Sequence, residues 1–370
     1  MPEPLRTLLA DYHASRGVAL TTYHGALAPA RFSDLIAEHR AARETAGIFD
    51  FSFRVKMCVA GQDRAAFLHN MLSNDIKRLA PGQGTYATLL DLKGHIVADL
   101  RVYCASDLFL LDTDADLVEK LVQTLERYII MDDVAVERLS LGTLSVQGTR
   151  ARELAETVFA TRLPPLEEFG HASIDHAGAQ ARVVRSSSTG EEGYELWVEA
   201  RGLVPLWESM CRAGQALAAL PCGCEALETL RIEAGIPRYG ADFGEDTLPL
   251  EAGLLDALSF TKGCYLGQEI VERARSRGHV NWKLAGLVVE SDGAPAPGEK
   301  LVAGDKEVGE ITSSCLSPTL GKVIALGYLR REAAEPGTEL ALASGAAAQV
   351  TSLPFYSSAE ARNSKPENRT

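Results

Sequence analysis

The sequence predicts an α+β protein that ends in a small all-β domain. Up to about residue 280, short apolar strands alternate with amphipathic helices, which is typical of α+β folds. From Lys283 onward the helical signal disappears, and Gly and Pro separate short apolar runs, as in a β-barrel or sandwich. A chain of 370 residues holds roughly two or three domains, each able to bury its own core.

The first α+β block shows two strand–helix alternations. Its expected elements are a strand at 55–59, an amphipathic helix at 62–72, strands at 100–103 and 109–111, and a helix at 114–130. The last helix is the clearest, because its apolar residues repeat at helical spacing. Asp114 or Asp116 is expected to cap its N-terminus.

A second α+β block follows, with strands expected at 181–185 and 194–198 and helices at 203–217 and 225–234. A polar loop, 186–193, joins the two strands. Along 194–198, side chains alternate between two faces, so Tyr194 shares one face with Leu196, and Glu195 shares the other with Trp197. The all-β region has apolar runs at 284–289, 300–302, 307–311, 323–329 and 339–343.

The charge balance excludes several partners. The formal net charge is −13, so we expect no nucleic-acid partner and no anionic membrane surface. No stretch approaches the ~18 apolar residues that a membrane span needs. A local basic cluster could still hold an anion, and one candidate is Arg273, Arg275, Arg277, His279 and Lys283. A solvated helix face explains the same run, since Glu269 and Arg273 are spaced as a surface ion pair.

Cysteine usage favours a reducing, cytoplasmic compartment. There are seven cysteines, and the odd count and scattered spacing do not fit a disulfide framework. The close pair Cys222 and Cys224 lacks the two-residue spacer of zinc motifs, so we expect no metal site. The first 17 residues lack the apolar core of a signal peptide. The polar tail, 357–370, is expected to be disordered.

The segment Lys262-Gly263-Cys264-Tyr265-Leu266-Gly267-Gln268-Glu269 is the most informative in the chain. It places one cysteine beside a lysine and just before a predicted helix, 270–277. A thiolate there is favoured by the cation and by the positive end of the helix dipole. A strand-to-helix turn with an incidental cysteine explains the segment equally well.

Six motifs in fixed order resemble the aminomethyltransferase family, which comprises the glycine cleavage system T protein and its relatives. They are GIFD at 47–50, SNDI at 73–76, TGEEGYE at 189–195, LRIEAG at 230–235, PLEAG at 249–253 and SPTLGK at 317–322. The resemblance covers nearly the whole chain. It implies a three-domain cloverleaf, two α+β domains plus a C-terminal β-barrel, around a central channel that holds tetrahydrofolate.

The resemblance also implies domain boundaries. Residues 1–50 with 138–245 would form the first, folate-binding α+β domain. Residues 51–137, with 246–280, would form the second, and 281–356 the barrel.

The segment around Cys264 resembles the YgfZ-type branch of the family rather than the T protein proper. That branch comprises folate-binding proteins that support maturation or repair of iron–sulfur proteins. One cysteine cannot hold an iron–sulfur cluster alone, so a cluster role would need ligands from a partner, such as an assembly or client protein. On this reading Cys264 and Lys262 carry the specific activity.

Two positions depart from the T protein pattern. The T protein has two consecutive aspartates, the first held to be catalytic, where this chain has Ala98-Asp99. Neighbours on a strand point to opposite faces, so we expect Asp99 not to replace the missing carboxylate. The second departure is Leu227, where the T protein has a folate-binding arginine. Both departures predict that aminomethyl transfer is lost.

The resemblance assigns the remaining site residues. Glu195 matches the pterin-binding glutamate, and a single carboxylate can accept two adjacent ring donors. Tyr86 matches a pocket tyrosine, with core packing as the rival explanation. Asp99 is counted with the cofactor-binding residues. Arg231 is also counted with the cofactor-binding residues, although pairing with Glu233 or another acid is favoured over ligand contact. Gln268 and Lys262 are expected to reach the anionic folate tail or to organise the cysteine turn.

Three functions stay open. The main hypothesis is a tetrahydrofolate-binding protein that supports iron–sulfur enzymes. The alternative is an active aminomethyltransferase or a related folate-dependent demethylase. The third is a scaffold in which a bound folate derivative serves structure alone.

Overall fold

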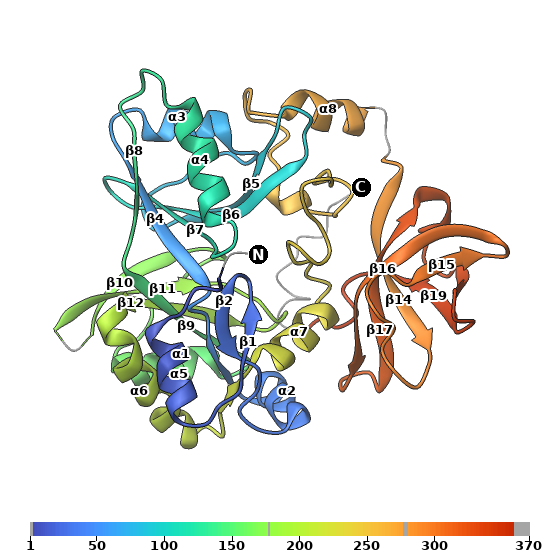
Figure 1. Ribbon diagram of the computed structural model, residues 1–370. Helices are drawn as coiled ribbons and strands as arrows, with labels where there is room; N and C mark the ends of the chain where they lie inside the picture. Colours follow the sequence, from blue (N-terminus) through green and yellow to red (C-terminus); the bar gives the residue numbers. More distant parts are fainter. Residues whose placement is uncertain (1–2, 177, 277–279, 359–370) are drawn as a thin grey trace.

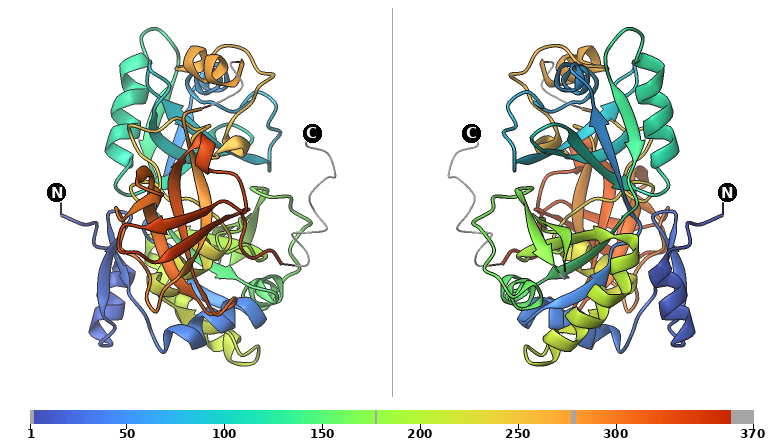
Figure 2. Two further views of the ribbon diagram at one scale, coloured as in Figure 1. Left: turned by 90° about the vertical axis from the view of Figure 1, so that its right-hand side faces the viewer. Right: turned by 90° about the vertical axis from the view of Figure 1, so that its left-hand side faces the viewer.

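Two sheets and one closed barrel contain nearly all the strands of the computed structural model, which describes residues 3–176, 178–276 and 280–358 (Figure 1). This confirms the predicted α+β fold with a C-terminal β-barrel. The barrel lies beside the junction of the two α+β parts, one above the other in Figures 1 and 2. The junction is therefore bordered by all three parts.

The six-stranded sheet forms the core of the lower α+β part. Its order is β10 (His171–His176), β11 (Ala179–Arg185), β12 (Gly193–Glu199), β9 (Leu141–Gln147), β3 (Gly47–Asp50) and β13 (Leu220–Cys222). Helices α1 (Leu8–Ser15), α5 (Ala151–Phe159) and α6 (Leu203–Gln215) contribute to its core, and α2 (Leu35–Glu44) packs on α7 (Cys224–Glu233). As predicted, Tyr194 and Leu196 enter this core, while Glu195 and Trp197 face the other side.

The five-stranded sheet forms the core of the upper part. Its order is β5 (Gly84–Leu90), β6 (Ile96–Cys104), β7 (Phe109–Asp114), β4 (Arg54–Ala60) and β8 (Ala135–Arg138). Helices α3 (Arg64–Met71) and α4 (Val118–Tyr128) pack on it. The predicted helix at 114–130 begins only at Val118, and neither Asp114 nor Asp116 caps it. The cap prediction is wrong because Asp114 is the last residue of a buried strand and bonds Arg54.

The barrel closes in the order β14 (Trp282–Glu290), β17 (Lys322–Arg330), β16 (Lys306–Ser317), β15 (Lys300–Ala303), β18 (Glu339–Leu342) and β19 (Ala347–Thr351). The sequence pattern missed β19. Elsewhere, β1 (Leu20–Tyr23) and β2 (Ala26–Pro29) form a hairpin, and α8 (Gln268–Ser276) precedes the barrel. Short 3₁₀ turns lie at Ala200–Gly202, Leu255–Ala257 and Arg331–Ala333.

The strands divide between the two sheets by their position in the chain, and the predicted domain boundaries stay a prediction. β3, which ends at Asp50, shares one sheet with the strands from Leu141 to Cys222, the strands from Arg54 to Arg138 share the other, and β1 and β2 form a separate hairpin. Side chains from 243–271 pack on Leu90 and Ile96 of the second sheet. Of the predicted disordered tail, 359–370 lies outside the described residues.

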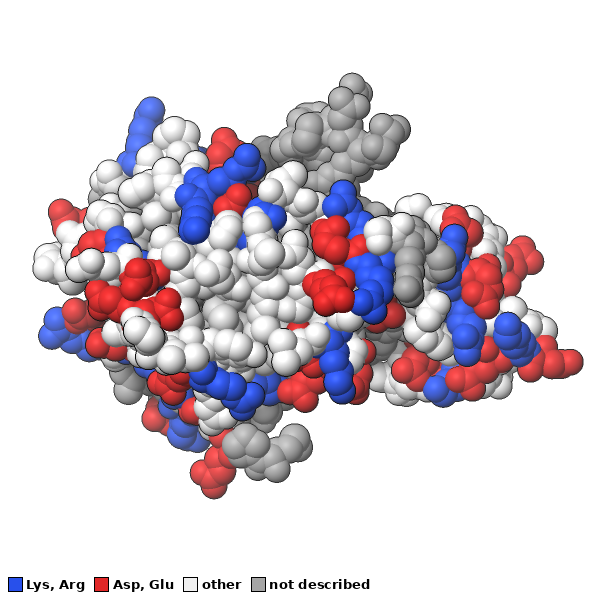
Figure 3. Space-filling view, turned by 90° about the horizontal axis from the view of Figure 1, so that it is seen from above, with Lys and Arg blue, Asp and Glu red and all other residues white. Residues whose placement is uncertain are grey.

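Charges on the face in Figure 3 are interspersed rather than sorted by sign. Lys and Arg side chains alternate with Asp and Glu around a broad uncharged area. No helix among the described residues is long and apolar enough to cross a membrane.

Candidate functional site

A cavity of about 560 Å³ opens where the three parts of the molecule meet. Its wall includes six aromatic side chains: Tyr23, Phe51, Phe53, Tyr86, Phe169 and Tyr239. Leu353 and Pro354, just after the barrel, also line it. A cavity of this size with aromatic walls and a few charged groups suits a small ligand that carries a flat ring.

Asp99 presents the least satisfied acceptor in this cavity. Its Oδ2 accepts a hydrogen bond of 2.9 Å from the Tyr86 hydroxyl, and its buried Oδ1 has no hydrogen-bond partner among the described residues. Burial, followed by the nearby Asp114 charge, raises the pKa of Asp99 above its usual value. A buried carboxylate oxygen without a donor is the kind of group that a ligand N–H satisfies.

Ala98 faces the opposite way, which corrects the expectation drawn from its position. Its side chain is fully buried in the core beneath α3 and α4, whereas Asp99 borders the cavity. The two residues do alternate across the strand as predicted, but the faces were assigned the wrong way round. A bulge places Ile96 opposite Leu90 and Ala98 opposite Leu89, and regular alternation resumes after it. The cavity therefore keeps its carboxylate.

A buried ionic network lies next to Asp99. Arg54 bonds both Asp112 and Asp114 at 2.8 Å, and Lys56 bonds Asp112 at the same distance. Burial alone would raise the pKa of Asp112, but the Arg54 and Lys56 charges outweigh it and lower that pKa to about 2. The charges of Arg54 and Lys56 are thus compensated by Asp112 and Asp114. Among the described residues, no cation forms a hydrogen bond with Asp99.

Three potential metal ligands, His24, Asp114 and Asp116, lie within 4.8 Å of one another. Asp114 already bonds Arg54 and lies 2.6 Å from His24 Nδ1. Because these contacts use the ligand atoms, we assign no metal here.

Glu195 is fully buried behind the cavity wall. One of its oxygens accepts a bond from Arg101, which does line the cavity, and the other accepts from the Trp197 ring N–H at 3.1 Å. A direct pterin contact would require Arg101 or Trp197 to release its bond. The anchoring role of Glu195 stays a prediction, and its structural effect is to orient Arg101.

Arg231 lines the cavity and is held by acids, as expected, but not by Glu233. It bonds Glu228 at 2.8 Å and Asp242 at 2.5 Å, and it also reaches Ser313 of the barrel at 2.7 Å. Its charge is thus neutralised by the protein. Leu227 borders the same cavity as an apolar side chain.

The segment around Cys264 lies outside the set of cavity-lining residues. Cys264 is exposed, Gln268 begins α8, and neither side chain borders the cavity. The Lys262 ammonium donates to the carbonyls of His69, Leu72 and Asn74 at the end of α3. The structure therefore separates these three predicted residues from Tyr86, Asp99 and Arg231.

Two residues of the basic run near α8, Arg273 and Arg275, form surface ion pairs. Arg273 bonds Glu269, as its spacing predicted, and Arg275 lies 3.5 Å from Glu272. Arg277 and His279 of the same run lie outside the described residues.

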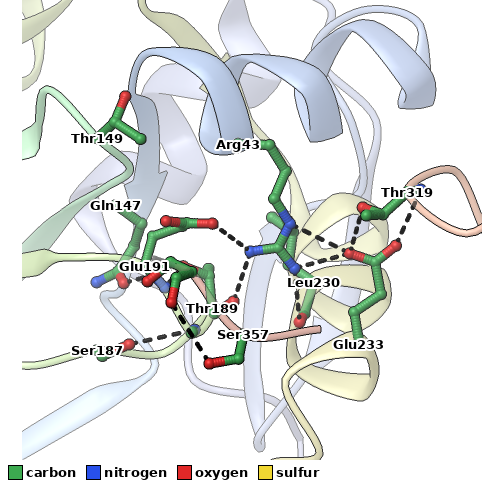
Figure 4. Close-up of polar contacts among 12 residues, drawn as sticks. Arg43, Gln147, Thr149, Ser187, Thr189, Glu191, Leu230, Glu233, Thr319 and Ser357 are labelled. Carbon is green, nitrogen blue, oxygen red and sulfur yellow. Dashed lines mark hydrogen bonds and ion pairs between the residues drawn. The ribbon is translucent and has the colours of Figure 1, made fainter. Parts of the chain in front are cut away.

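Arg43 on α2 connects the loop that holds Thr189 and Glu191 to Glu233 at the end of α7 (Figure 4). It bonds Glu191 and the Thr189 carbonyl in the loop that lines the cavity through Ser187, and it bonds Glu233 of α7 at 2.7 Å. The Tyr356 ring, close after Pro354 in the chain, lies 4.1 Å from its guanidinium. Glu191 is thus buried in an ion pair.

Sequence reasoning missed Arg43, Arg54 and Arg101. Arg54 and Arg101 are charged residues in or beside predicted apolar strands, and that conflict was the available signal, whereas Arg43 lies on a helix, α2, that the sequence pattern did not predict.

Comparisons with known proteins identify the family of the chain. Residues 9–262 match the GCVT N-terminal domain, and 283–357 match the glycine cleavage T-protein C-terminal barrel domain. The aminomethyltransferase of Halothermothrix orenii is 31% identical over 95% of this chain and 99% of its own length. The one from a Geobacillus species is 33% identical over 96% and 99%.

A solved structure supports the same fold. The glycine cleavage system aminomethyltransferase T from Bartonella henselae superposes with a TM-score of 0.88 at 25% identity, covering 95% of this chain and 98% of that one. These relatives are named aminomethyltransferases, so the finer placement in the YgfZ-type branch finds no support among them. The chain belongs to the glycine cleavage T-protein (aminomethyltransferase) family, whose members use tetrahydrofolate.

Proposed function

We propose that this protein is a folate-dependent one-carbon transferase, with an aminomethyl group as the transferred unit. The observation that carries the proposal is the unpartnered Oδ1 of Asp99 in an aromatic-lined cavity. The main argument against transfer was a missing carboxylate, and the cavity retains one. The names of the similar proteins point to the same reaction.

The residues present fit a reduced folate. Phe51, Phe53 and Phe169 offer apolar faces for a flat ring, and the buried Asp99 oxygen offers an acceptor for a ring or linker N–H. Tetrahydrofolate, when bound, supplies the nitrogen nucleophile that receives the one-carbon unit.

Asp99 would orient that nitrogen and stabilise positive charge that develops beside it. Tyr86 holds the carboxylate in place through its hydroxyl. Burial and the Asp99 charge keep the pKa of Tyr86 well above its usual value, so the phenol stays a donor. The Arg54 network joins β4 to β7, and β7 is the strand next to β6, which carries Asp99.

Calorimetric titration with tetrahydrofolate, followed by an aminomethyl-transfer assay on the same sample, tests the proposal. The wild type should bind and turn over. Asp99→Asn should slow transfer by about 10² or more, with binding changed only a few-fold. The matched control is Asp107→Asn, on an exposed turn, which should leave transfer unchanged. Absence of turnover in the wild type, or full turnover by Asp99→Asn, would contradict the proposal.

A second function, support of iron–sulfur enzymes, is favoured by one observation. Cys264 is exposed, whereas the other six cysteines are buried or half-buried. Its accessible thiol could therefore meet a partner protein. This function would be separate from the chemistry at Asp99, because Cys264 does not line the cavity.

Rescue of iron–sulfur enzyme activity in a deletion strain tests that second function. Cys264→Ala should abolish rescue and leave tetrahydrofolate affinity unchanged, with Cys211→Ala as the control. Full rescue by Cys264→Ala would exclude a role for this thiol.

A further inference from the structure

Four arginines line the cavity, and they differ in how far the protein neutralises them. Arg54 is bonded by two aspartates, Arg101 by Glu195, and Arg231 by Glu228 and Asp242. The fourth, Arg238, lies in the loop that follows α7. It has the weakest set of partners, so it is the cation most available to an anionic ligand.

The contacts of Arg238 leave its side-chain donors unused. Its Nε lies 3.1 Å from a Glu228 oxygen, yet this buried N–H makes no hydrogen bond, and no other side-chain donor of Arg238 bonds a described residue. Glu228 is shared, since it also bonds Arg231 at 2.8 Å and the Tyr23 hydroxyl at 2.6 Å. Arg231 has Asp242 as a second acid, whereas Arg238 has Glu228 alone among the described residues as an ion-pair partner and keeps hydrogen-bonding capacity for a ligand.

Arg238 and Asp99 occupy different environments within one cavity. The Arg238 side chain is 27% exposed, whereas the free Oδ1 of Asp99 is fully buried. The centroid of the Tyr23 ring lies 5.4 Å from the guanidinium carbon of Arg238. The cavity therefore holds a buried acceptor at Asp99 and, at Arg238, a partly exposed guanidinium with hydrogen-bonding capacity left, as suits a ligand with a ring at one end and an anion at the other.

We propose that Arg238 binds the anionic end of the ligand, a carboxylate of the glutamyl tail if the ligand is a reduced folate. The inference rests on the proposed function. It adds the residue that would favour pterin ligands with a glutamyl tail over those without one. A guanidinium and a carboxylate can form two parallel charge-assisted bonds. Arg238 would then be a specificity-determining residue, while Asp99 acts on the ring end.

Calorimetric titration with two ligands tests the proposal: tetrahydrofolate, and tetrahydropteroate, which lacks the glutamate. Arg238→Gln should weaken tetrahydrofolate binding by about ten- to a hundredfold, the range expected for lost charge-assisted bonds. It should change tetrahydropteroate binding less than threefold. Arg238→Lys should give an intermediate loss, because it keeps the charge and loses the paired geometry.

Arg40→Gln is the matched control, since it removes an arginine from an exposed ion pair on α2. Thermal unfolding of each variant establishes that it is folded. If the wild type binds neither ligand, the proposed function fails. If the wild type binds tetrahydrofolate and Arg238→Gln binds it equally well, or loses both ligands equally, the assignment of Arg238 alone is overturned.

Discussion

Ala98 and Asp99 are neighbours on β6 with opposite surroundings. Ala98 contacts the apolar core, so a carboxylate placed there would be buried away from the cavity and from any cation. We predict that Ala98→Asp lowers the free energy of unfolding by about 3 kcal/mol or more, as for an unpaired buried charge. Urea unfolding measures the loss.

The same variant separates two explanations of the site. If the missing aspartate had mattered for chemistry, Ala98→Asp would raise transfer activity in whatever fraction folds. We expect no gain, because Asp99 already supplies the carboxylate that faces the ligand.

Glu233 is the acid that holds the α7 end of the Arg43 cluster. Burial would raise its pKa, but hydrogen bonds from His39, Ser317 and Arg43 outweigh burial and lower the pKa to about 2. A carboxyl with a lowered pKa in the folded state stabilises the protein above its unfolded pKa of 4.5, and that stabilisation is lost as the pH falls from about 4.5 to about 2.

We therefore predict that Glu233→Gln lowers the free energy of unfolding by about 3 kcal/mol at pH 7. The difference from the wild type should shrink as the pH falls from 4.5 toward 2. Chemical unfolding at several pH values checks this, with the exposed Glu44→Gln on α2 as the control. A difference that does not depend on pH would show that shape rather than charge matters at this position.

At the scale of elements, Lys262 closes the C-terminal end of α3. The last carbonyls of a helix lack partners inside it, and a cation there also faces the negative end of the helix dipole. Lys262 is 8% exposed and donates to three carbonyls, two of them at 2.5 and 2.9 Å. Burial lowers the pKa of Lys262 to about 8.

We predict that Lys262→Met destabilises the fold by at least about 2 kcal/mol, because buried carbonyls lose charge-assisted bonds. Any loss of transfer should then follow the loss of folded protein. Unfolding midpoints and transfer rates on the same preparation check this. The surface variant Lys77→Met, near the same helix end in sequence, is the control. A stable Lys262→Met with no activity would instead assign this lysine to the chemistry.

At the scale of the whole molecule, the cavity has walls from all three parts. Ser187 and Ser188 come from the first, Asp99 from the second, and Leu353 follows the barrel. A ligand that bridges these walls binds the assembled protein only, so it should stabilise all three parts together. The expected gain is about 2.7 kcal/mol at a ligand concentration of 100 Kd.

Hydrogen exchange with and without tetrahydrofolate tests this coupling. We predict slower exchange at 186–193, at 234–239 and at 353–356 on addition of the ligand. The outer barrel hairpin, β18 with β19, serves as the internal reference. Protection confined to the segment around Cys264 would place the ligand elsewhere.

Local patterns along the chain were enough to predict the α+β class, the barrel and most helices and strands. They also identified Glu195 as facing away from its neighbours Tyr194 and Leu196, because alternation along a strand is a local property. Within the described part of the chain, the same patterns missed three helices (α1, α2 and α5) and nine strands (β1, β2, β3, β5, β8, β9, β10, β13 and β19), and they gave Asp114 a capping role. Its partner Arg54 lies 60 residues away in the chain, so no local signal could reveal that bond.

Sequence by itself determined the family, through ordered motifs. It also determined which residues of a strand such as 194–198 share a face. Only the tertiary structure decided which face of β6 borders the cavity, that Glu195 bonds Arg101, that Lys262 caps a helix, and that Arg238 pairs with Glu228 and with no other described acid. The physical reason is that alternation shows which residues share a face of a strand but not which of the two faces is buried. Which face lies in the core, and which charges compensate each other, depends on contacts between residues far apart in the chain.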